Sequence, residues 1–140
     1  MRHALFLLAL LATPALAQIE IENAWTRATP PGANTAAGYM TIRNQSSSPD
    51  HLIGAASPLA ARVEMHVHLH GGDVMRMRQV KGYDLPAKGS LELKPGIAHL
   101  MFVDIKQPFK QGEKIPVTLR FERAGQMTVT FTVGRIDMQH

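Results

Sequence analysis

The chain has 140 residues, with 15 Lys and Arg against 11 Asp and Glu, and its formal net charge is +4. No basic run is interleaved with aromatic residues, so the composition gives no support for a nucleic-acid partner. The chain contains no cysteine, which excludes disulfides and any metal site built on a thiolate. Eight methionines and seven histidines are present instead.

The first 17 residues have the pattern of a secretory signal peptide. A weak basic start precedes an apolar run at residues 4–12, and Ala15-Leu16-Ala17 supplies an A-x-A cleavage site. The run is shorter than the roughly 20 residues that a membrane-spanning helix needs, and no cysteine follows it to carry a lipid. We expect cleavage after Ala17 and a periplasmic protein of residues 18–140 with no stable membrane insertion, in preference to a retained anchor.

From residue 18 onward, the chain is expected to be all-β and to form one domain. Segments of alternating apolar and polar residues predict strands, in chain order, at 19–27, 36–44, 51–56, 61–70, 73–80, 90–94, 97–105, 115–123 and 127–133. Turn residues separate them, and 82–86 is expected to be an irregular link. Many short strands at regular spacing are typical of a Greek-key β-sandwich or barrel. Its expected core contains Trp25, Phe102, Phe121 and Phe131.

The strands at 61–70 and 73–80 concentrate histidine and methionine. His66, His68 and His70 alternate with apolar residues, and Met75 and Met77 alternate with arginines. We expect the Gly71-Gly72 pair between them to be the two-residue turn of a β-hairpin, because such turns need φ > 0. This register places His66 opposite Met77, His68 opposite Met75 and His70 opposite Asp73, with all three histidines and both methionines on one face.

A second pair, His99 and Met101, lies two residues apart on a predicted strand and therefore shares one face. Two imidazoles and two thioethers make a soft, neutral ligand set that suits Cu(I). We predict a Cu(I) site formed by His66, Met77, His99 and Met101. The ordinary alternatives are a surface position for His66 and a packing role for Met77.

Other histidines and methionines are candidates for auxiliary copper ligands. His68 with Met75 could form a second, weaker site, at which Cu(II) is an open alternative, and His70 lies beside the turn. Met138 and His140 could capture copper from a C-terminal tail. The ordinary interpretations are a solvated hairpin tip and a disordered chain end.

The four-ligand spacing H-x10-M-x21-H-x-M resembles that of the periplasmic copper chaperones of the PCu(A)C family. The segments 24–32, 74–78 and 93–96 also look like this family. The resemblance implies a cupredoxin-like β-barrel that binds Cu(I) near its surface. It also implies delivery of copper toward the CuA centre of cytochrome c oxidase, directly or with a Sco-type thiol protein. The family often has methionine where this chain has His68, which implies a higher affinity for Cu(II) or Zn(II).

We expect the protein to bind and transfer copper and not to catalyse a reaction, because no nucleophile–base pair or paired carboxylates suggest an enzyme. We expect it to act as a monomer. A neutral ligand set leaves the charge of Cu(I) uncompensated, so a shallow site near the rim of the fold is expected. Binding should weaken as histidines become protonated at lower pH. The acceptor would be a copper-accepting oxidase subunit or a Sco-type protein. Alternatives are copper sequestration without a dedicated acceptor and an adhesion or assembly module that binds no metal, whereas blue-copper electron transfer is excluded because it needs a cysteine.

Overall fold

The computed structural model describes residues 18–137, and the elements of this part are ten β-strands. They are β1 (Ile19–Arg27), β2 (Thr35–Asn44), β3 (Asp50–Ala56), β4 (Ala60–Gly71), β5 (Val74–Val80), β6 (Tyr83–Leu85), β7 (Ser90–Leu93), β8 (Ala98–Ile105), β9 (Lys114–Phe121) and β10 (Gly125–Gly134). The expected all-β fold is confirmed. The predicted signal peptide, Met138 and His140 lie outside the described residues.

Strand β6 corrects the prediction of an irregular link at 82–86. Tyr83, Asp84 and Leu85 pair with the start of β3, which orders a segment too short to show an alternating pattern of its own. None of the described segments forms an apolar helix of membrane-spanning length.

A ring of strands closes into a barrel in the order β4-β8-β2-β1-β10-β9-β3, and β3 returns to β4 through the pair Ala55 and Val63. The barrel is mixed, because β1 and β10 run parallel whereas their neighbours pair in antiparallel fashion. Strands β5, β6 and β7 lie outside the ring and pair with β4, β3 and β2. Closure of the ring leaves no long open edge in the barrel wall itself.

The barrel interior contains the three phenylalanines expected there: Phe102 and Phe131 are fully buried, and Phe121 is buried as well. Trp25 is buried too, but the prediction that it lies in this core is wrong, because it pairs with exposed Thr132 and packs on Tyr39 at the outer face, with ring centroids 4.7 Å apart. Phe102 meets Phe109 and Phe131 edge-on, with ring centroids 5.5 and 6.3 Å apart. Because side chains alternate along β8, the inward direction of Phe102 puts His99 on the outer face.

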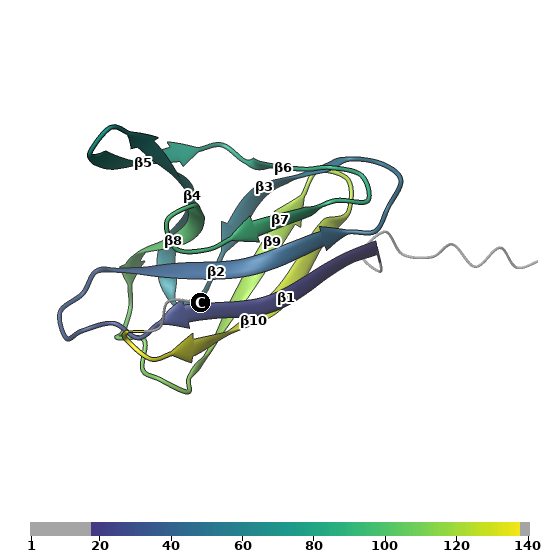
Figure 1. The fold of residues 1–140 in the computed structure, drawn as a ribbon. Coiled ribbons are helices and arrows are strands. Elements are labelled where there is room, and N and C mark those ends of the chain that lie inside the picture. Colours follow the sequence, from purple (N-terminus) through teal and green to yellow (C-terminus); the bar gives the residue numbers. More distant parts are fainter. Residues whose placement is uncertain (1–17, 138–140) are drawn as a thin grey trace, which may run out of the picture.

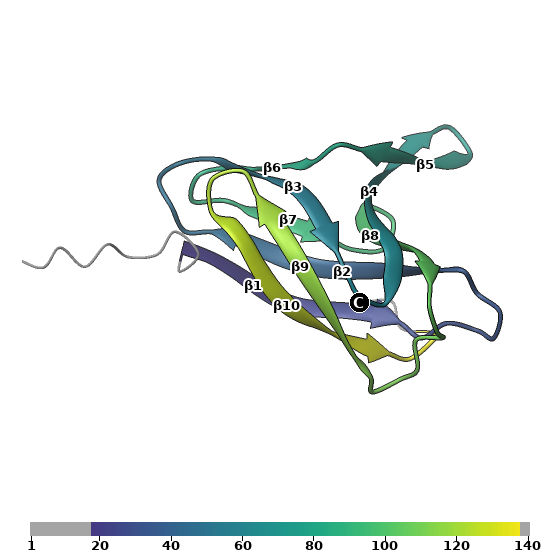
Figure 2. The same cartoon turned by 180° about the vertical axis from the view of Figure 1, so that it is seen from behind.

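The β4–β5 hairpin projects from the barrel at the end away from the start of β1, in both views (Figures 1 and 2). Strand β4 is long enough to serve two partners. Its residues up to Val67 pair with β8, and residues from Met65 to Gly71 pair with β5. The outer faces of β5, β4 and β8 therefore form one continuous surface at this corner.

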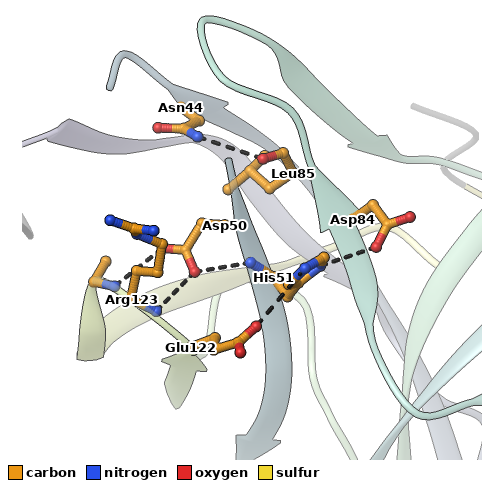
Figure 3. A network of polar contacts seen from close by, with 8 residues as sticks. Asn44, Asp50, His51, Asp84, Leu85, Glu122 and Arg123 are labelled. Atoms are coloured by element: carbon orange, nitrogen blue, oxygen red, sulfur yellow. Dashed lines mark hydrogen bonds and ion pairs between the residues drawn. The ribbon is translucent and has the colours of Figure 1, made fainter. Parts of the chain in front are cut away.

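A polar network ties β3 to the β9–β10 turn (Figure 3). The buried carboxylate of Asp50 accepts hydrogen bonds from the backbone N–H groups of His51, Arg123 and Ala124, at 2.8, 2.8 and 3.0 Å. The half-exposed ring of His51 lies 2.9 Å from the carboxylate of Asp84 and 3.7 Å from that of Glu122. These contacts tie the start of β3 to β6 and to the β9–β10 turn.

Candidate metal centre

The β4–β5 pairing corrects the predicted register of the hairpin. His66 lies opposite Gln79, His68 opposite Met77 and His70 opposite Met75, so each predicted pair is displaced by two residues. The loop residues are Gly72 and Asp73, and only Gly72 has a positive φ, of 59°.

This conformation is typical of a type II′ turn, in which only the first loop residue requires φ > 0. One glycine is therefore enough, and Gly71 extends β4 instead of entering the turn. A displacement by two residues preserves side-chain direction. The three histidines and two methionines of the hairpin thus remain on one face, as predicted.

The same face continues onto β8. His66 lies directly opposite His99, and Glu64 lies opposite Met101. The rings of His66 and His99 stack with centroids 5.3 Å apart, and His68 meets His99 edge-on at 5.0 Å. Two of the four predicted ligands, His66 and His99, are thus in contact, and His68 joins them.

The ring of His68 connects the buried and exposed parts of the cluster. Its Nε2 lies 3.0 Å from Nδ1 of His99, and its Nδ1 lies 3.1 Å from Sδ of Met75. His70 turns away from this cluster, because its Nε2 lies 2.9 Å from the carbonyl oxygen of Gly96 in the β7–β8 loop.

His66 is held by a carboxylate. Its Nε2 lies 3.0 Å from Oε1 of Glu64, and Oε2 of Glu64 accepts a hydrogen bond from Nε of Arg62 at 2.8 Å. The remaining nitrogens of the two stacked rings, Nδ1 of His66 and Nε2 of His99, are buried and have no hydrogen-bond partner in the described part of the chain. Buried polar atoms without partners are rare and costly, so two of them in adjacent rings point to a ligand.

Exposure rises steeply across the cluster. His99 is only 2% exposed, whereas Met75 and Met77 are 57% and 53% exposed. The ring of Tyr39, on the neighbouring strand β2, lies edge-on to His99 with ring centroids 6.2 Å apart. The cluster therefore combines the buried imidazole of His99 with the solvent-accessible thioethers of Met75 and Met77.

Burial lowers the pKa of His99 to about 4, and the neighbouring charges of His68, His66 and Arg27 act in the same direction. The pKa of His68 is lowered too, mainly by burial and then by His70 and His66. Both rings are therefore neutral at pH 7. A neutral imidazole is the form that binds metal, so protons compete little at these two residues.

Two residues of the site were missed by sequence reasoning. The hydroxyl of buried Tyr83 lies 2.7 Å from the carbonyl oxygen of His66 and 2.9 Å from that of His99, so it fixes the backbone at the point where the two rings stack. No sequence signal indicated this role. Glu64 could have been found, because it precedes His66 by two residues and therefore shares its face.

Within residues 18–137, no three His, Asp or Glu side chains are grouped so that they could hold a metal ion by themselves. Thioethers would have to complete a site here. Met77 lies opposite His68 and Met101 opposite Glu64, both on the face that carries the imidazoles. The set of His66, Met77, His99 and Met101 remains a prediction.

Comparisons with known proteins give consistent results. The sequence model of the family described as "Putative lipoprotein LpqE-like" matches residues 19–133. The protein named "Putative lipoprotein Lxx21020" from Leifsonia xyli subsp. xyli is 31% identical over 116 residues, which cover 82% of this chain and 69% of that protein.

Two solved structures resemble the whole barrel. The copper-bound PCuAC domain from PmoF2 is 30% identical, with a TM-score of 0.73, and the match covers 84% of this chain and 93% of that domain. The solution structure of Cu(I)-bound DR1885 from Deinococcus radiodurans is 31% identical, with a TM-score of 0.69, and the match covers 94% and 85% of the two chains.

Proposed function

Because the chain belongs to the LpqE-like family of PCuAC-type domains, we propose that it binds one Cu(I) ion outside the cytoplasm and passes this ion to another protein. The observation that carries the proposal is the outer face shared by β5, β4 and β8. There, stacked imidazoles share one face with exposed thioethers, and two buried ring nitrogens have no partner among the described residues. We propose His66, Met77, His99 and Met101 as the ligands.

The donor set fits Cu(I). Thioethers and neutral imidazoles are soft or borderline ligands that favour Cu(I) over the hard cations. They add no negative charge, so the ion keeps its charge and is best accommodated where solvent can reach it. The exposed Met77 meets this condition.

The exposure gradient also suits transfer rather than catalysis. A partner can reach the copper from the side of the exposed thioethers and replace them one at a time, while the buried His99 still holds the ion. We propose the CuA-bearing subunit of cytochrome c oxidase or a Sco-type thiol protein as the acceptor, with the chain acting as a monomer.

We also propose a location in the periplasm. The description of the matching family as lipoproteins and the signal-like residues 1–17 support this location.

Deletion of the gene tests delivery. If the protein supplies copper to the oxidase, the deletion should lower oxidase activity and CuA content at limiting copper, and added copper should restore both. The wild-type gene should complement the defect, whereas a Met77→Ala gene should not.

Copper sequestration without a dedicated acceptor is the competing function, since exposed thioethers also suit simple capture. It predicts normal oxidase activity at limiting copper and increased sensitivity of the deletion strain to excess copper. That pair of results would contradict delivery.

A further inference from the structure

The hydrogen-bond partners of the three central histidines determine which ring nitrogens carry protons. A neutral imidazole has one N–H donor and one acceptor nitrogen, and the hydrogen bonds of a ring select between its two tautomers. An ionised carboxylate can only accept, and so can a thioether. Both kinds of acceptor lie at the ends of the histidine cluster.

At one end, Glu64 fixes the tautomer of His66. The carboxylate lies 3.0 Å from Nε2 of His66, so this nitrogen must be the donor. The second oxygen of Glu64 accepts from Arg62, which keeps the carboxylate ionised and in place. In the neutral ring, Nδ1 of His66 is then a lone pair, and this atom is buried without a partner.

At the other end, Met75 fixes two rings in succession. Sδ of Met75 lies 3.1 Å from Nδ1 of His68, so Nδ1 donates and Nε2 of the same neutral ring accepts. The hydrogen-bond partner of that Nε2 within residues 18–137 is Nδ1 of His99, at 3.0 Å, so Nδ1 of His99 donates to it. Nε2 of His99 is then a lone pair as well, and it is also buried without a partner.

We propose that Glu64 and Met75 are positioning residues, which fix the imidazole tautomers so that Nδ1 of His66 and Nε2 of His99 stand as the two nitrogen donors for Cu(I). The copper part rests on the proposed function, whereas the tautomers are a property of the metal-free protein. In this arrangement both nitrogens of His68 are engaged, so His68 organises the site and does not bind the ion.

The metal-free protein provides the first test. Long-range ¹H–¹⁵N correlation spectra of the labelled protein at neutral pH distinguish the two tautomers of each ring. We expect the Nε2–H form for His66 and the Nδ1–H form for His68 and His99. An Nδ1–H form for His66 or an Nε2–H form for His99 would overturn the proposal.

Variants test whether the two acceptors cause the preference. Glu64→Leu should convert His66 to a mixture of tautomers, whereas Glu64→Gln, whose side-chain oxygen can still accept, should preserve the Nε2–H form. Met75→Leu should mix the tautomers of His68 and His99 but leave His66 unchanged. Glu92→Leu and Met127→Leu, on β7 and β10, are matched controls that should change none of the rings. Unchanged tautomers in both Glu64→Leu and Met75→Leu, with native amide spectra, would refute the positioning roles.

Addition of one equivalent of Cu(I) without oxygen tests the donor atoms. The ¹⁵N resonances of His66 Nδ1 and His99 Nε2 should shift most, while the other nitrogen of each ring keeps its proton. Largest shifts at His66 Nε2 and His99 Nδ1 would overturn the assignment. If no imidazole or methionine methyl signal changes, the proposed function fails, and the tautomers are still judged from the metal-free spectra.

Discussion

The buried position of His99 should make the stability of the metal-free protein depend on pH in a defined window. The pKa of His99 falls from its ordinary 6.5 to about 4 in the fold, mainly through burial. Between pH 6.5 and pH 4, His99 is protonated in the unfolded chain but neutral in the folded protein, so the free energy of unfolding decreases as pH falls. Above pH 6.5 this residue contributes no slope, and below pH 4 its full cost has been reached.

The size of the effect follows from the shift. One pKa unit corresponds to about 1.4 kcal/mol, so the shift of His99 should cost about 3 kcal/mol between pH 7 and pH 4. This is a large share of the ~5–15 kcal/mol that stabilises a typical domain.

Urea unfolding of the metal-free protein at several pH values between 7.5 and 4 measures the effect. The His99→Gln variant is the control, because its side chain is polar and does not titrate. The unfolding free energy of the wild type minus that of the variant should decrease as pH falls from 6.5 to 4, because only the wild type has a buried imidazole that resists protonation. A difference that stays flat or grows toward pH 4 would refute the argument that burial keeps His99 neutral.

Three further predictions concern the scaffold. Tyr83→Phe removes the hydroxyl that contacts the carbonyl oxygens of His66 and His99, and it should lower the free energy of unfolding in urea by about 1–2 kcal/mol. An unchanged midpoint would contradict the role of this hydroxyl in holding the two strands together. Asp50→Ala leaves three backbone N–H groups without their acceptor and should lower the free energy of unfolding by about 2–4 kcal/mol, measured by thermal unfolding. Asp84→Ala removes the exposed carboxylate that contacts His51 and should change the thermal midpoint little. Equal effects of these two substitutions would count against the network. Gly38→Ala places a Cβ atom 2.8 Å from the ring of Phe102 and should cost about 1–3 kcal/mol in guanidinium unfolding, so a neutral result would mean that the ring moves freely.

Much of the site could be predicted from alternation alone. The period of two along the chain placed His66, His68 and His70 on one face and Leu100 and Phe102 in the core, and both placements are confirmed. The register of the hairpin was wrong because two adjacent glycines allow two turn positions, and only backbone conformation decides between them.

The depth of His99 could not be predicted, because alternation assigns it only to the outer face of β8. Its cover comes from Tyr39 on β2 and from His66 and His68 on β4, which are distant in sequence. The contacts of the Tyr83 hydroxyl with the carbonyl oxygens of His66 and His99 could not be predicted for the same reason, since β6 acquires its position only by pairing with β3. Local pattern predicts side-chain direction, but burial depends on which strands become neighbours.

The central claim is that one Cu(I) ion is bound by histidine and methionine on the outer face of β5, β4 and β8. The most direct measurement is an anaerobic titration of the purified protein against a Cu(I) chelator, with X-ray absorption on the loaded sample. We predict one tight equivalent with mixed nitrogen and sulfur scattering, and sharply weaker binding after alanine substitution of His66, Met77, His99 or Met101. Failure to compete for Cu(I), or binding by all four variants that equals the wild type, would contradict the account.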